Sequence, residues 1–331
     1  MNSHKTWPDN WHSEFVDPDK QYKSSSVKIE AVLYSGESEF QKISVVMTSS
    51  YGRALLLDRV MVKTERDSWL FNEMMGFLPL GMVNEPRDVL IVGGGDGGVA
   101  GEILKHPTVE NVVIVERDQR VVDISMRYFE DSSVSIRDSR VEVIVGDPLL
   151  VTQRRGEKFD VIIVDMFSDM RSPAHKVVAA ELLHGLQYIL KTEGVICYQQ
   201  PSPLVNDTAL REQMRMFHRY YPSVGYALNI APTFPQGSVG FALMSRQEGV
   251  DFSVPKQGFG VEEARELGLR CYNTEVHQGS FMCVPSIVRD MVSEGHPDTP
   301  STETAPPVSV NKKHIYSVQS MSTRQHSVRD N

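Results

Sequence analysis

Cysteine is scarce in this chain, with three among 331 residues. Cys197, Cys271 and Cys283 lie far apart and are odd in number, so they match neither a zinc-ligand spacing nor a disulfide framework. The scarcity excludes a disulfide-stapled secreted scaffold. It predicts a reduced, cytoplasmic setting and no protein-bound metal.

Long apolar runs and basic charge are lacking as well. No stretch approaches the roughly 20 apolar residues that span a bilayer, and the polar N-terminus shows no apolar signal region. We therefore expect no membrane partner. The formal net charge of -9 is opposite in sign to the basic excess typical of nucleic-acid-binding proteins. It favours a small or cationic partner and argues against nucleic acid.

Four zones follow one another, and none contains an internal repeat. Residues 1–25 form a polar N-terminal segment, and residues 26–80 read as a small β-domain with a connecting helix. Residues 81–295 alternate strand and helix patterns. Residues 296–331 are rich in Pro, Ser and Thr and are expected to be a disordered tail.

The third zone carries near-continuous apolar runs, which are typical of strands buried on both faces of a parallel sheet. The runs are DVLIV (88–92), NVVIVE (111–116), VEVIVGD (141–147), FDVIIVD (159–165) and GVICYQQ (194–200). Two further runs, VGYALNIA and GSVGFALMS, complete the sheet. The pattern predicts an α/β fold, a Rossmann-like doubly wound and mostly parallel sheet of the class I methyltransferase type, preceded by the small β-domain.

A glycine-rich loop, GGGDGG (93–98), follows the first of these runs and precedes a helical pattern. Gly93, Gly95 and Gly98 fit the GxGxxG spacing, which lets backbone approach a nucleotide closely. Glu116 ends the next strand, where an acid roughly 20 residues on accepts hydrogen bonds from a ribose diol. The pattern predicts a nucleoside-containing ligand. The alternative is a tight turn with an ordinary solvent-facing glutamate.

Acidic residues gather around this loop. Asp96 lies inside it, and Asp147 and Asp165 end the third and fourth strands, whose carboxyl ends meet at one crevice. Asp96 would repel a pyrophosphate and attract a cation, which favours a sulfonium nucleoside over NAD. Structural roles remain as alternatives: Asp96 as a helix N-cap, Asp147 as a turn residue, and Asp165 as the cap of the next segment.

Several segments resemble the polyamine aminopropyltransferases, the spermidine synthase family. They are GGGDGG (93–98), LLLDRVMVKTERD (55–67), FNEMM (71–75), LPL (78–80), FDVIIVD (159–165), APTFPQGSVGF (231–241) and YNTEVHQGSF (272–281). The similarity runs in family order from about Trp11 to Val292. It implies transfer of the aminopropyl group of decarboxylated S-adenosylmethionine to an amine such as putrescine, with release of methylthioadenosine. The donor is a co-substrate, and no prosthetic group is implied.

The resemblance also implies roles on the donor side. Asp96 would bind the aminopropyl ammonium and oppose the carboxylate of intact S-adenosylmethionine. Glu116 would bind the ribose, Asp147 the adenine, and Gln41 another part of the donor. A primary amine with a pKa of roughly 10.4 must lose a proton before it attacks the carbon beside the sulfonium. Asp165 is therefore the expected catalytic proton acceptor.

The acceptor side departs from the family pattern. The positions expected to bind the amine are Asp169, Phe71, Asn72, Gln199 and Phe234, and at four of them the family usually has a tyrosine, a histidine or glutamine, or a different neighbour. Asp169 is displaced by one residue from the expected second acid, which otherwise falls on Ser168. Each lost charge-assisted hydrogen bond would cost an ammonium about 1.5–3 kcal/mol.

These departures leave three hypotheses open. The chain is an aminopropyltransferase of spermidine synthase type, with putrescine or a less polar acceptor. Alternatively it is a catalytically weak or inactive paralogue that regulates or assembles with an active homologue. A methyltransferase using intact S-adenosylmethionine is the third, and Asp96 argues against it. By resemblance we expect a homodimer or homotetramer, with a hetero-oligomer containing an active homologue as the alternative.

Overall fold

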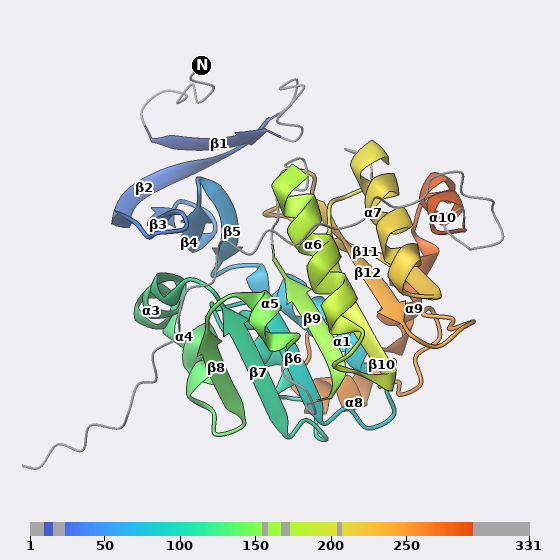
Figure 1. Cartoon of the computed structure of the whole chain (residues 1–331). Helices are drawn as coiled ribbons and strands as arrows, with labels where there is room; N and C mark the ends of the chain where they lie inside the picture. Colours follow the sequence, from blue (N-terminus) through green and yellow to red (C-terminus); the bar gives the residue numbers. More distant parts are fainter. Residues whose placement is uncertain (1–9, 16–23, 154–157, 167–172, 204–206, 294–331) are drawn as a thin grey trace, which may run out of the picture. The chain divides into compact units, whose positions relative to one another are not determined.

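The computed structural model describes residues 10–15, 24–153, 158–166, 173–203 and 207–293. Two sheets organise this part of the chain, one of five strands and one of seven (Figure 1). The predicted tail, residues 296–331, lies outside the described residues. None of the helices in the described part combines the length and apolarity that a bilayer crossing requires.

The five-stranded sheet is an antiparallel meander in the order β1-β2-β3-β4-β5. Its strands are β1 (Trp11–Phe15), β2 (Ser24–Glu37), β3 (Lys42–Thr48), β4 (Gly52–Leu57) and β5 (Val60–Thr64). The sequence predicted no strand before residue 26. β1 nevertheless pairs with β2 over five residues, because backbone hydrogen bonds to a neighbouring strand need little apolar patterning of their own.

The turn between β4 and β5 is made by Asp58 and Arg59, both with positive φ, at 48° and 70°. Two-residue hairpins favour this conformation, since its twist matches that of the strands. Aspartate tolerates it, and the Asp58 carboxylate accepts a hydrogen bond from the Lys42 backbone N–H at 2.9 Å. Arginine has no such compensation, so Arg59 is a strained residue at this turn.

We expect Arg59→Gly to raise the free energy of unfolding by about 0.5–1 kcal/mol. The left-handed conformation costs an L-residue about 1–2 kcal/mol, and glycine avoids this cost. Glycine loses more conformational entropy on folding, which offsets about 0.5–1 kcal/mol of the gain. Urea unfolding measures the change. Arg59→Ala is the matched control, because alanine keeps the strain. A similar gain in both variants would show that the arginine side chain, not its φ, is unfavourable.

The seven-stranded sheet has the order β11-β12-β10-β9-β6-β7-β8, and β12 alone runs in the opposite direction to the other six strands. Its strands are β6 (Asp88–Gly93), β7 (Asn111–Glu116), β8 (Val141–Val145), β9 (Phe159–Asp165), β10 (Leu190–Gln200), β11 (Ser223–Ile230) and β12 (Ser238–Ser245). Every run read from the sequence as a strand of this sheet is one. The predicted Rossmann-like fold of class I methyltransferase type, with a small β-sheet ahead of it, is confirmed.

Helices cover both faces of this sheet. They are α1 (Ser68–Leu80), α2 (Gly98–Ile103), α3 (Gln119–Tyr128), α4 (Glu130–Ser133), α5 (Pro148–Val151), α6 (Pro173–Leu186), α7 (Asp207–Tyr220), α8 (Val261–Glu266), α9 (Thr274–Met282) and α10 (Ser286–Ser293), with a 3-10 turn at Val134–Arg137. Figure 1 shows α6 and α7 crossing one face. Alternate residues of β6 feed two cores: Ile91 packs with α1, and Leu90 with α6 and α7.

A third apolar cluster joins the five-stranded sheet to the α/β part of the chain. Ile43 and Val45 of β3 and Leu55 of β4 pack on Val121 and Ile124 of α3. Because α3 follows β7, this contact brings β5 and the β2–β3 turn close to the carboxyl ends of β6 and β7. The glycine-rich loop and Glu116 lie at those ends.

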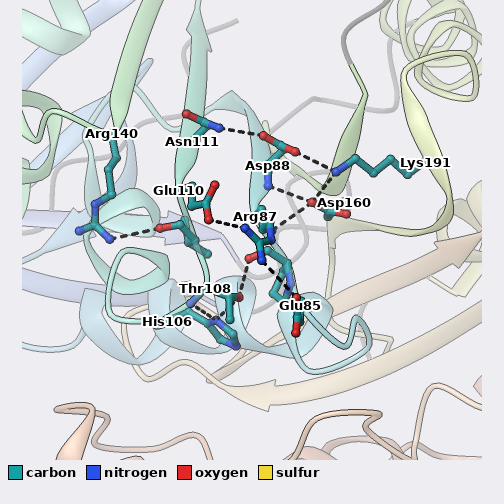
Figure 2. Close-up of polar contacts among 12 residues, drawn as sticks. Glu85, Arg87, Asp88, His106, Thr108, Glu110, Asn111, Arg140, Asp160 and Lys191 are labelled. Carbon is teal, nitrogen blue, oxygen red and sulfur yellow. Dashed lines mark hydrogen bonds and ion pairs between the residues drawn. The ribbon is translucent and has the colours of Figure 1, made fainter.

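The opposite edge of the large sheet is tied by ion pairs (Figure 2). Lys191 Nζ lies 2.8 Å from a carboxylate oxygen of Asp88 and 2.8 Å from one of Asp160, at the starts of β10, β6 and β9. Asp160 also accepts hydrogen bonds from two backbone N–H groups, those of Arg87 and Asp88. Lys191 thus offsets part of the negative charge of the two aspartates. The contacts link the starts of β6, β9 and β10, whereas the glycine-rich loop lies at the carboxyl ends of the strands.

Candidate active site

The glycine-rich loop turns sharply away from β6. Gly93 and Gly97 have φ of 83° and 74°, a region where side chains are disfavoured. A Cβ at Gly93 would lie 2.2 Å from the backbone oxygen of Asp165, its register partner on β9. Glycine is therefore required for the loop to lie against the end of β9. Gly98 then begins α2.

Glu116 lies against this loop and is partly buried. Its Oε2 accepts a hydrogen bond from the Gly95 backbone N–H at 3.2 Å, and its Oε1 accepts one from that of Asp118 at 3.0 Å. Burial raises the pKa of Glu116, and the Asp118 carboxylate adds to the rise. The side chain is held at the edge of the crevice, where its ribose contact stays a prediction.

Asp165 ends β9 on the other side of the loop. Burial raises the pKa of its carboxyl to about 7, with further contributions from the carboxylates of Asp96 and Glu116, while Lys63 opposes the rise. A Cβ added at Gly94 would lie 3.3 Å from Asp165 Oδ2, and one added at Gly95 would lie 2.8 Å from Glu116 Oε2, so the carboxylates of both residues lie against the loop that carries Asp96. A group that titrates near neutral pH is suited to taking up a proton during the reaction.

Asp96 makes two contacts at once. Its Oδ1 accepts a hydrogen bond from the Gly98 backbone N–H at 3.0 Å, a local contact at the start of α2. Its Oδ2 lies 2.6 Å from Nζ of Lys63 on β5. Lys63 was not identified from the sequence. The available signal was a lysine at a position of β5 whose alternation with Met61 places it on the buried side of the strand.

The remaining donor-side residues differ in where they lie. Gln41 donates from Nε2 to Asp118 Oδ2 at 3.1 Å, so it stands beside the segment that follows Glu116. Asp118 is also bonded by Ser38 at 2.6 Å and was not identified from the sequence. Asp147 is exposed and caps α5 through the Leu149 backbone N–H at 2.9 Å. Contacts of Gln41 and Asp147 with a donor stay predictions.

The aromatic acceptor-side residues meet above β5. The rings of Phe71 and Phe234 stack with centroids 5.8 Å apart. A cavity of about 20 Å³ lies here, lined among others by Met61, Val62, Lys63 and Asp67. Asp67 Oδ2 accepts a hydrogen bond from the Thr233 backbone N–H at 2.9 Å and so holds the Phe234 loop beside α1. Asp67 was not identified from the sequence.

The other predicted acceptor residues are less directly placed. Asn72 is buried, and its side chain packs on Gly98, where an added Cβ would lie 2.3 Å from Nδ2. Gln199 is partly buried near the end of β10, and its backbone oxygen accepts a hydrogen bond from Gln200 Nε2 at 2.8 Å. Asp169 lies outside the described residues.

Fold and site together define a Rossmann-like α/β protein with a carboxylate-lined glycine-rich loop at the carboxyl ends of its parallel strands. Comparison with known proteins makes this specific. Residues 69–254 match the spermine/spermidine synthase domain, and residues 10–65 match the spermidine synthase tetramerisation domain. The chain belongs to the spermine/spermidine synthase family, and the resemblance read from the sequence is confirmed.

Relatives with similar sequence identity to this chain include spermidine synthases and a spermine synthase. Spermidine synthase 2 of Arabidopsis thaliana is 34% identical over 289 residues, which cover 85% of this chain and 84% of the relative. Spermine synthase of the same plant is 35% identical over 278 residues, covering 82% and 76%. A crystal structure of a spermidine synthase with the transition state analogue AdoDATO superimposes with a TM-score of 0.77 at 26% identity, covering 88% of this chain and 98% of that one.

Proposed function

We propose that this aminopropyltransferase takes decarboxylated S-adenosylmethionine as donor and a small cationic amine such as putrescine as acceptor, releasing methylthioadenosine. The supporting observation is the carboxylate cluster of Asp96, Glu116 and Asp165 around one glycine loop. A sulfonium and its ammonium groups are cations, and fixed carboxylates stabilise them in a site where water is displaced.

Each carboxylate is expected to contact a different part of the substrates. Glu116, beside Gly95, is placed to accept hydrogen bonds from the ribose hydroxyls. Gln41 and Asp147 would contact the rest of the nucleoside. Asp96 would face the charged tail of the donor. Asp165, with its pKa near neutrality, is the group available to accept a proton.

The expected reaction is a direct displacement at the aminopropyl carbon. The acceptor ammonium loses a proton to the Asp165 carboxylate and becomes a neutral amine. Its nitrogen lone pair attacks the aminopropyl carbon bonded to sulfur, forming a C–N bond. The C–S bond breaks, its electron pair stays on sulfur, and neutral methylthioadenosine leaves. Loss of the sulfonium charge weakens product binding in an acidic site, which favours release.

The acceptor would enter beside Phe71 and Phe234. These rings and Val62 form an apolar part of the lining of the small cavity, which Lys63 and Asp67 also line. The methylene chain of a diamine fits such a wall. We propose that Asn72, Gln199 and Asp169 complete the acceptor side, as the sequence predicts.

The direct test incubates the purified full chain with decarboxylated S-adenosylmethionine and a panel of amines that includes putrescine and spermidine. We expect methylthioadenosine to form with at least one of them. If none yields methylthioadenosine above the amine-free background, the catalytic function is refuted for this chain, and the regulatory-paralogue hypothesis takes its place.

Glu116→Gln should weaken methylthioadenosine binding by roughly 10- to 100-fold. The change removes charge-assisted hydrogen bonds to the ribose diol, each about 1.5–3 kcal/mol. Isothermal titration calorimetry measures the affinity. Glu142→Gln, an exposed carboxylate on the neighbouring strand β8, is the matched control and should leave it unchanged. Equal methylthioadenosine affinities for both variants would show that Glu116 does not contact the ribose.

Assembly and location extend the proposal. The match of residues 10–65 to a tetramerisation domain supports self-association through the five-stranded sheet. We propose a homodimer or homotetramer, and light scattering on the full chain distinguishes them from a hetero-oligomer that needs an active homologue. The cytoplasmic location and the zone boundaries at residues 25, 80 and 295 stay predictions of the sequence.

A further inference from the structure

Lys63 places a buried ammonium inside the site. Its side chain is 3% exposed, and Nζ lies 2.6 Å from Asp96 Oδ2 and 3.3 Å from the Asp96 backbone oxygen. The Phe129 ring lies 5.5 Å away. A buried ammonium is stable only when it is paired. Lys63 therefore belongs to the acidic cluster as its built-in countercharge.

This pairing changes what Asp96 offers to a ligand. An unpaired carboxylate at Asp96 would attract the ammonium of an amine-only tail and repel a tail carboxylate. With Lys63 in place, the ammonium of an incoming ligand competes with the Lys63 ammonium for the Asp96 carboxylate. A tail carboxylate, in contrast, finds a cation within reach. Lys63 also lines the small cavity beside Phe71, so it stands between the donor loop and the acceptor side.

We propose that Lys63 is a donor-specificity residue that reduces the preference for decarboxylated S-adenosylmethionine over intact S-adenosylmethionine. The inference rests on the proposed function, because it assumes an S-adenosyl sulfonium donor with its tail at Asp96. The amino-acid tail of the intact donor can pair its ammonium with Asp96 and its carboxylate with Lys63. The amine-only tail gains nothing from Lys63 and is opposed by it.

A purely structural lysine would behave differently. Lys63 joins β5 to the glycine loop, so its removal is expected to lower the thermal stability in either case. A structural role alone would weaken all adenosyl ligands by the same factor, because the loop would be misplaced for each of them. A specificity role changes the ratio of the two donors and leaves a tail-less ligand unaffected.

The test measures dissociation constants by calorimetry for three ligands: decarboxylated S-adenosylmethionine, intact S-adenosylmethionine and methylthioadenosine, which has no charged tail. We expect Lys63→Met to shift the ratio of the two donor constants at least tenfold toward the decarboxylated donor. The methylthioadenosine constant should stay within twofold. Lys63→Arg keeps the charge and should keep the wild-type ratio. Lys42→Met, exposed on β3, removes the same charge elsewhere and should change neither.

The outcomes separate the two proposals. An unchanged donor ratio in folded Lys63→Met, with methylthioadenosine still bound, overturns the role of Lys63 and leaves the proposed function standing. Failure of the wild-type chain to bind any of the three ligands overturns the proposed function itself. If Lys63→Met does not fold, Lys63→Gln gives the same comparison, because its amide can still donate to Asp96 without a charge.

Discussion

Asp165→Asn should reduce aminopropyl transfer by roughly 10²- to 10⁴-fold while methylthioadenosine binding stays within about threefold. General bases contribute about this much to catalysis. Asparagine matches aspartate in size but accepts no proton, so the acceptor amine stays charged. Steady-state kinetics measures the loss, and calorimetry supplies the binding control. Activity within tenfold of the wild type would show that another group, or water, accepts the proton.

The pH dependence of kcat/KM tests the role of Asp165 as proton acceptor independently. Burial and the neighbouring carboxylates raise the pKa of Asp165 from 3.8 to about 7. A base acts only when it is unprotonated, so kcat/KM should rise with pH up to about 7 and then level off. In Asp165→Asn this limb should disappear from the residual rate. A limb that persists in the variant would belong to a different group.

The raised pKa also predicts an effect on stability. Below about pH 4 the carboxyl is protonated in both the folded and the unfolded chain. Between about pH 4 and 7 only the unfolded chain loses the proton, so the folded state becomes less stable as pH rises. Asp165→Asn removes this penalty. Urea unfolding should show the variant more stable than the wild type by about 1–3 kcal/mol at pH 8, with no difference near pH 4.

The features that the sequence predicted share a local origin. The strand FDVIIVD is apolar on both faces because both faces are covered, and it ends at Asp165 because the loop side of the sheet is polar. The glycine pattern at 93–98 is required by the positive φ of Gly93 and Gly97. Such constraints act within a few residues, so the fold and the glycine loop could be read directly.

The features that the sequence did not predict depend on residues far apart in the chain. Lys63 on β5 of the small sheet contacts Asp96, which lies 33 positions later in the glycine-rich loop of the large sheet. Asp118 meets Ser38 across 80 positions. Only the packing of the small sheet on α3 brings these side chains together, and neither the periodicity nor the motif spacing encodes it. For this reason Lys63 and Asp118 were missed, although Asp96, Glu116 and Asp165 were all identified from the sequence.

Glu73 makes a further contact between residues far apart in the chain, and replacing it should have the largest effect on the free energy of unfolding. The residue lies on α1 and is fully buried. Its carboxylate accepts hydrogen bonds from the backbone N–H groups of Arg270 at 3.0 Å, Cys271 at 2.7 Å and Tyr272 at 2.5 Å. These three donors belong to the segment that leads into α9, nearly 200 positions away. One side chain thus anchors the C-terminal part of the described chain to the core.

We expect Glu73→Ala to lower the free energy of unfolding by about 3–5 kcal/mol. Three backbone N–H donors, of which that of Tyr272 is buried and the other two are partly buried, would lose a charged acceptor. An unpaired buried group costs about 1–3 kcal/mol before the structure relaxes, and the partly buried ones cost less. Urea unfolding measures the loss, and hydrogen exchange should show faster exchange at residues 270–272. Glu262→Ala, which removes an exposed carboxylate paired with Arg265, should stay within about 0.5 kcal/mol. Equal losses in the two variants would mean that water replaces the Glu73 carboxylate, and that the 270–272 segment holds its place through Tyr272 packing alone.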